Sequence, residues 1–293
     1  MRHFLVRTIT SSCLLLIVWG LFSCGKEKTL SPNEPPAFYS LPQGNHSYDD
    51  SIVAFNKKYG SYILYKFTQQ DFAYDITGYL SSLAANANQA YVQQTLTFFR
   101  TQCLDFYPET FLKKTLPFRI ILAAHLDTMT NWIGRPSDTS RSLTGFTASH
   151  NMIAIGWADS TLQQRTPDQL RQTKGYLNRC YFQQALLSGA LAIPDIFMKL
   201  GPVGGYSSVN GYQPGRGMIE IPSSDDRDRN ASATWDFLCY INAITAHTKA
   251  ELDATILNPS VDVNGKIQEK YDALINYYKV QYGVDLQAIG NHL

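Results

Sequence analysis

The chain has 293 residues, with 17% charged and 13% aromatic residues and a formal net charge of +1. Because there is no basic surplus, the composition excludes the charge signature of a nucleic-acid-binding protein. The length suffices for one sizeable hydrophobic core or for two small ones.

Residues 1–23 are predicted to be an export signal. Arg2 and Arg7 form a short basic region, and the apolar run Cys13–Leu21 is too short to cross a bilayer, which needs about 20 apolar residues. Ser23 directly precedes Cys24. This arrangement resembles the lipobox of bacterial lipoproteins, which implies cleavage before Cys24 and lipidation of its thiol. An ordinary cleaved signal and an uncleaved anchor are the alternatives.

A flexible tether is predicted at residues 24–42, because Gly25–Pro42 is polar and contains four prolines. Such a segment has too little apolar surface to order itself. No second linker and no internal repeat follow, so residues 43–293 are predicted to form a single domain. The lipid would hold this domain at the membrane without a transmembrane helix.

The first half of the domain is predicted to contain a small sheet. Its strands are indicated by short runs rich in aromatic and β-branched residues, and its helices by longer runs of mixed polarity. In chain order, the expected elements are a helix at Asp49–Lys58, a strand at Gly60–Phe67, a long helix at Asn86–Phe106, a strand at Pro117–Ala124, and a strand or hairpin at Gly145–Trp157.

The second half is predicted to be mainly helical. A helix at Pro167–Ala192 begins with Thr166 as its cap, and a glycine- and proline-rich loop is expected at 201–217. Helices are also expected at Ala231–Ala246 and Ile267–Gln281, the latter amphipathic with Ile267, Tyr271, Leu274, Tyr278 and Tyr282 on one stripe. A small mixed sheet followed by helices predicts the α+β class.

Two segments carry a resemblance to a known family. Asp49–Phe67 contains an aspartate-led helix, a "KYG" turn and a strand ending in "LYKF", and Gly265–Gly290 contains a tyrosine-rich helix followed by "VDL". Both segments, and the order of elements between them, are similar to zinc-binding metallopeptidase lipoproteins of Bacteroidetes. This resemblance implies a zincin-like fold, in which HExxH on a helix and a later acidic residue hold zinc, and the glutamate activates the bound water.

The sequence departs from that family pattern at the expected zinc ligands. The downstream Ile193–Phe197 sets the register of this comparison. The two histidine positions of HExxH then carry Tyr181 and Ala185, the glutamate position carries Phe182, and two glutamines stand between Phe182 and Ala185. The later acidic stretch corresponds to Trp235, Asp236 and Cys239, of which only Asp236 is acidic. We refer to these six positions as the zinc slot. The family implies zinc as a cofactor, but the ligands are absent, so no metal site and no catalytic residue are predicted here.

The histidines support this prediction. They stand at positions 3, 46, 125, 150, 247 and 292, and no two are three to five residues apart. No helical two-histidine zinc motif can therefore form. A non-standard metal site assembled from His125, His150 and Asp236 is the alternative. A cluster of Asp225, Asp226, Asp228 and Asn230 could bind calcium or could cap the following helix.

Three cysteines remain after the predicted cleavage and lipidation, at positions 103, 180 and 239. In an exported protein they allow one disulfide and one leftover thiol. If the family fold is kept, the helices that carry Cys180 and Cys239 pack together, so these two thiols would lie near each other, bonded or unbonded. The alternative is two unrelated buried cysteines.

Two functions from different classes follow. The first is a non-catalytic, outer-membrane-anchored lipoprotein of the cell envelope that binds a peptide or glycan. The resemblance implies partners for it, namely an outer-membrane transporter and a glycan-binding lipoprotein of a polysaccharide-uptake system. The second is an active hydrolase with a non-standard metal site. A zinc slot filled by side chains would favour the first function.

Overall fold

The computed structural model describes residues 38–75, 82–129, 139–209, 212–220 and 232–292. One compact unit runs from Leu41 to Leu293. The predicted signal, Cys24, most of the tether and the Asp225–Asn230 cluster lie outside the described residues. None of the helices in the described ranges combines the length and the apolar run that crossing a bilayer would need.

The sheet is organised around one long strand, β3 (Arg119–Met129). Its first half pairs in parallel with two strands, β1 (Tyr62–Leu64) and β6 (Met152–Ile155). Its second half pairs antiparallel with β2 (Ser82–Asn86) and β4 (Thr139–Arg141). Strand β5 (Phe146–Ala148) pairs antiparallel with β6 and completes the sheet.

Apolar runs account for the parallel part of the sheet. Ile120, Ile121, Ile153 and Ile155 are all fully buried. Side chains alternate between the two faces of a strand, so consecutive buried residues mean that both faces are covered. Helices provide this cover.

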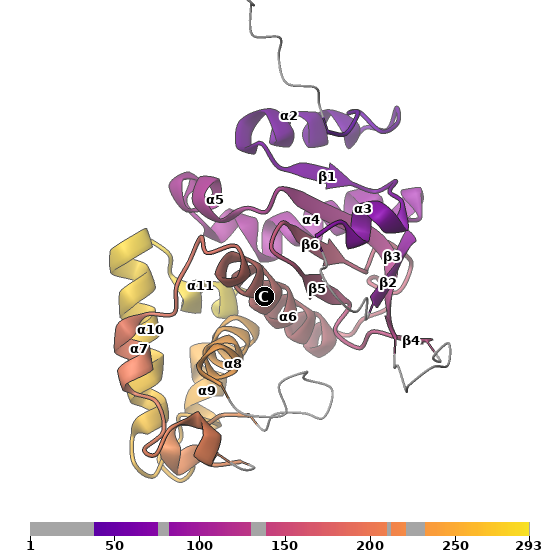
Figure 1. Ribbon diagram of the computed structural model, residues 1–293. Helices are drawn as coiled ribbons and strands as arrows, with labels where there is room; N and C mark the ends of the chain where they lie inside the picture. The colour runs from indigo at the N-terminus through magenta and orange to yellow at the C-terminus, as the bar shows by residue number, and fades with distance from the viewer. Residues whose placement is uncertain (1–37, 76–81, 130–138, 210–211, 221–231, 293) are drawn as a thin grey trace, which may run out of the picture. The chain divides into compact units, whose positions relative to one another are not determined.

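The three longest helices, α6, α8 and α10, all follow β6 (Figure 1). They are α2 (Asp49–Tyr59), α3 (Gln69–Ala73), α4 (Val92–Gln102), α5 (Glu109–Thr115), α6 (Pro167–Leu187), α7 (Asp195–Lys199), α8 (Ala233–Ala246), α9 (Lys249–Ala254), α10 (Lys266–Tyr282) and α11 (Leu286–Asn291), with 3-10 turns η1 (Gln89–Tyr91), η2 (Leu104–Phe106), η3 (Tyr206–Ser208) and η4 (Pro214–Arg216).

Helix α6 connects the sheet to the helical half. It packs against β5 and β6 on one side and against α8 on the other (Figure 1). Its start is fixed by a capping box, in which Gln169 N donates to Thr166 Oγ1 and Thr166 N donates to Gln169 Oε1. Pro167 occupies the first turn, where its missing N–H leaves no intrahelical bond unmade.

The α+β prediction is confirmed, because a small mixed sheet precedes a helical half. The hairpin, the start of the helix at Pro167 and the C-terminal amphipathic helix are also found, and the buried face of α10 includes Ile267, Tyr271, Leu274 and Tyr278.

Four predicted elements are wrong in extent. The helix expected at Pro167–Ala192 ends at Leu187, and the strand expected at Pro117–Ala124 runs from Arg119 to Met129. The helix expected from Asn86 begins only at Val92, because Asn88 accepts a hydrogen bond from Ala90 N and forms a separate turn. The strand expected at 60–67 is shortened to Tyr62–Leu64. The amides of Tyr65 and Lys66 donate to the side-chain oxygen of Gln43 and are lost to the sheet.

Candidate functional site

The zinc slot on α6 is filled by packed side chains. Tyr181, Phe182 and Ala185 are completely buried in the main hydrophobic core. The hydroxyl of Tyr181 shares a 2.7 Å hydrogen bond with the hydroxyl of Thr115, which satisfies its polar atom. The side chains at these positions therefore serve packing, because Phe182 and Ala185 carry no atom that can coordinate zinc and the Tyr181 hydroxyl is bonded to Thr115.

Further aromatic rings surround these positions. The ring of Tyr107 stacks on Tyr181 at a centroid distance of 5.2 Å, and the ring of Tyr278 meets Phe182 edge to face at 5.2 Å. Phe111 and Phe237 lie 6.3 and 6.1 Å from Phe182. These are the separations at which aromatic pairs attract one another. We call these six residues, Tyr107, Phe111, Tyr181, Phe182, Phe237 and Tyr278, the aromatic cluster.

Asp236, the one acidic residue left in the slot, already has a cationic partner. It lies in the first turn of α8, and its Oδ2 is 2.7 Å from Nζ of Lys270 on α10. Both side chains are fully buried. The hydroxyl of Tyr206 also donates to Asp236 Oδ2, at 2.8 Å, and Lys270 donates to the carbonyl of Gly217 at 2.9 Å.

Burial sets the electrostatics of this pair. Desolvation raises the pKa of Asp236, and the attraction of Lys270 opposes it. Desolvation likewise lowers the pKa of Lys270, opposed by the charge of Asp236. The Lys270 ammonium also lies 5.3 Å from the ring of Phe197 and 5.4 Å from that of Tyr240, where the ring faces favour a cation.

The remaining slot residues lie beside Asp236 on α8. Trp235 is buried in the core, and its amide donates to the capping hydroxyl of Ser232. The thiol of Cys239 donates to Oε2 of Glu220 at 3.2 Å, and Arg179 on α6 approaches the same oxygen at 3.7 Å. Desolvation and the Glu220 charge raise the pKa of the Cys239 thiol.

Cys180 and Cys239, which were expected to lie near each other either bonded or unbonded, do not form a disulfide. Cys103, Cys180 and Cys239 are all free and buried. The physical reason lies in their neighbours. Cys239 is directed to Glu220, to which its thiol donates a hydrogen bond. Sequence reasoning could place the helices together, but it could not fix the direction of each thiol.

The slot does not fit zinc. Asp236 Oδ1 is buried without a hydrogen-bond partner among the described residues, so the slot offers one oxygen atom that could coordinate a metal. A zinc site needs three or four ligands. In the ranges that the structure describes, no three His, Cys, Asp or Glu side chains are grouped as metal ligands.

The alternative ligands are not grouped either. His125 on β3 lies 3.5 Å from Asp127, His150 is exposed in the turn between β5 and β6, and Asp236 is occupied by Lys270.

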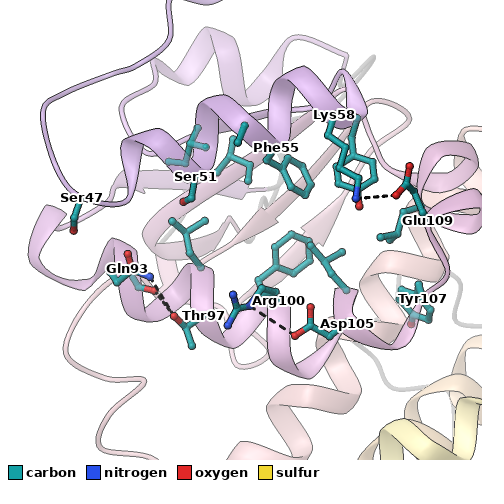
Figure 2. A pocket seen from close by; sticks show the side chains of 18 residues that line it. Ser47, Ser51, Phe55, Lys58, Gln93, Thr97, Arg100, Asp105, Tyr107 and Glu109 are labelled. Atoms are coloured by element: carbon teal, nitrogen blue, oxygen red, sulfur yellow. Dashed lines mark hydrogen bonds and ion pairs between the residues drawn. The ribbon is translucent and has the colours of Figure 1, made fainter.

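A groove that the sequence did not reveal lies between α2 and α4. Its volume is about 630 Å³, and its lining comes from α2, β1, α4, η2 and α5. Figure 2 shows Ser51, Phe55 and Lys58 on α2, opposite Gln93, Thr97 and Arg100 on α4. Two ion pairs stand in the groove, Lys58–Glu109 at 2.8 Å and Arg100–Asp105 at 3.7 Å (Figure 2).

The groove was missed because its two walls come from helices that are not adjacent in the chain, α2 ending at Tyr59 and α4 beginning at Val92, and no sequence motif links them. One signal existed: Phe55 and Tyr59 stand four residues apart on α2 and are only partly buried. Tyr107 joins the groove to the aromatic cluster, since it lines the groove and stacks on Tyr181.

Comparison with known proteins finds one solved structure whose backbone follows a similar path. No family model matches this chain, and no curated protein matches it. A crystal structure of a candidate zinc-binding metallo-peptidase from Bacteroides caccae ATCC 43185 is 11% identical in sequence, with a TM-score of 0.49; the match covers 86% of this chain and 92% of that one.

Replacement of the buried lysine should destabilise the domain strongly. Lys270→Met leaves Asp236 buried without its cation, and we expect a loss of about 3–5 kcal/mol in the free energy of unfolding, measured by urea denaturation. Adding Asp236→Asn should restore part of this loss, because the uncompensated charge is removed. Lys279→Met, on the exposed side of α10, should change stability by less than about 0.5 kcal/mol. Equal effects of the two lysine substitutions on stability would contradict the assignment of Lys270 as the buried partner of Asp236.

The thiols should be unreactive in the native protein. Burial raises the pKa of Cys180 to about 12, and burial raises the pKa values of Cys103 and Cys239 as well, so little thiolate exists at pH 8. We expect slow labelling of Cys103, Cys180 and Cys239 by a thiol reagent in buffer and fast labelling of these three in denaturant without reductant, with the labelled residues identified by peptide mapping. Recovery of only one reactive thiol in denaturant would instead indicate a disulfide.

Proposed function

We propose that the chain is a non-catalytic binding lipoprotein, anchored in the outer membrane through Cys24, whose metallopeptidase-like domain has lost its zinc ligands. In this proposal the domain serves as an accessory protein of a surface system that takes up glycans or peptides. An outer-membrane transporter and a glycan-binding lipoprotein are its proposed partners.

One observation carries the non-catalytic part of the proposal, namely that the zinc slot on α6 is a packed aromatic core. A zincin active site keeps an open coordination position for water and space for a substrate. Here Tyr181 and Phe182 are fully buried, and the rings of Tyr107, Tyr278 and Phe237 surround them. Neither water nor a substrate could reach this position without unpacking the core.

The buried ion pair adds a second line of support. An acidic zinc ligand would need its carboxylate free to face the metal, whereas Asp236 Oδ2 is held by Lys270 and Tyr206. The ammonium already compensates the negative charge. The anchoring part of the proposal rests on the sequence, through the signal-like residues 1–23 and the position of Cys24.

The test is metal content combined with peptidase activity. The full chain, purified without chelator, should contain far less than one zinc per molecule by elemental analysis. It should also fail to hydrolyse casein faster than the Lys270→Met variant and the buffer do. Near-stoichiometric zinc together with chelator-sensitive hydrolysis would overturn the non-catalytic reading and favour a hydrolase with a non-standard site. Mass spectrometry of the membrane-bound chain checks the acylation of Cys24 separately.

A further inference from the structure

The groove between α2 and α4 is a second feature, separate from the zinc slot. We propose that this groove binds a peptide, which places apolar side chains on the floor and a carboxylate at the charged end. This inference rests on the proposed role of the chain as a binding protein and names the site and the ligand class.

The floor of the groove is apolar and partly open. Ile52 and Phe99 each expose only 1% of their surface. Phe55, Tyr59 and Leu96 also line the groove and are partly exposed. Partly exposed rings and aliphatic side chains around a cavity of about 630 Å³ are the lining that small ligands and short peptide side chains occupy. The floor therefore selects apolar groups.

The charged end has cations that can serve a ligand. Glu109 is held by two lysines, with Lys58 Nζ at 2.8 Å from Oε2 and Lys113 Nζ at 2.7 Å from Oε1. These hydrogen bonds lower the pKa of Glu109 to about 2, so it stays ionised. Because Lys113 remains as its partner, Glu109 loses only one of two contacts when Lys58 turns to a ligand carboxylate. Lys58 is therefore the cation that can turn from Glu109 to a ligand carboxylate.

Arg100 is the second available cation. Its contact with Asp105 is made by Nε at 3.7 Å, which is longer than a hydrogen bond, and its side chain is 65% exposed. The two terminal nitrogens of its guanidinium have no partner among the described residues and lie at the rim of the same groove (Figure 2). A guanidinium with free terminal nitrogens suits a carboxylate.

The opposite end of the groove is polar and uncharged, which favours a peptide over a fatty acid. Gln93 donates to the hydroxyl of Thr97 and keeps its side-chain carbonyl as an acceptor, and Ser51 donates to the carbonyl of Tyr48 and keeps its lone pairs. Peptide N–H groups can meet these acceptors, whereas an alkyl chain would leave them unpaired. A neutral glycan would leave the cationic end unused.

Binding is tested with a pool of N-acetylated hexapeptides that alternate leucine, phenylalanine and serine. The full chain is held in lipid nanodiscs, and binding is measured by fluorescence anisotropy. We expect the pool with a free C-terminal carboxylate to bind about tenfold more tightly than the same pool amidated at its C-terminus. Decanoate and a neutral maltohexaose should not compete with the peptides.

Variants of the groove locate the site. The double variant Lys58→Gln/Arg100→Gln should abolish the preference for carboxylate over amide, and Phe55→Ala should weaken the binding of both pools. Glu109→Gln should strengthen carboxylate binding, because it removes the competitor for Lys58. Lys57→Gln, on α2 but outside the groove lining, is the matched control and should change nothing. All these side chains are at least partly exposed, so circular dichroism should confirm that the variants fold.

Equal binding of the two pools, binding that Phe55→Ala leaves unchanged, or binding of decanoate in place of the peptides would overturn this inference. Absence of any peptide binding would overturn it as well. None of these results alters the metal content or the peptidase assay, which test the proposed function. Failure of the groove is thus distinguishable from failure of the non-catalytic assignment.

Discussion

The buried ion pair between Lys270 and Asp236 is the interaction around which the helical half is arranged. Two opposite charges in an apolar interior are tolerated only when they meet closely, and further hydrogen bonds reduce the cost of burying them. Lys270 meets Asp236 across α8 and α10, and it also holds the carbonyl of Gly217. Tyr206 reaches the same carboxylate. One pair therefore links two helices with Tyr206 and Gly217, which lie in the segment between α7 and α8.

The aromatic cluster continues this arrangement towards the sheet. Phe237 on α8 and Tyr278 on α10 meet Phe182 on α6, and Tyr107 extends the contacts to the groove. The residues that the sequence resemblance placed at the HExxH positions are thus part of the core.

The sequence predicted those features that depend on local pattern. The apolar stripe on α10, the cap at Thr166 and the order of sheet and helices follow from periodicity and turn chemistry alone. Long-range partners could not be predicted in this way. Nothing near Lys270 in the sequence indicates Asp236, and the direction of the Cys239 thiol depends on Glu220. The groove escaped for the same reason, since its walls meet only in the folded chain.

The central claim is that the zinc slot is core packing and not a site. It is tested most directly by the stability of Phe182→Ala, measured by urea unfolding of the full chain, with the exposed neighbour Gln183→Ala as the reference. Removal of a fully buried ring from packed surroundings should lower the free energy of unfolding by about 3–5 kcal/mol, while the reference stays near wild type. A Phe182→Ala variant as stable as the wild type, or more stable, would contradict the account.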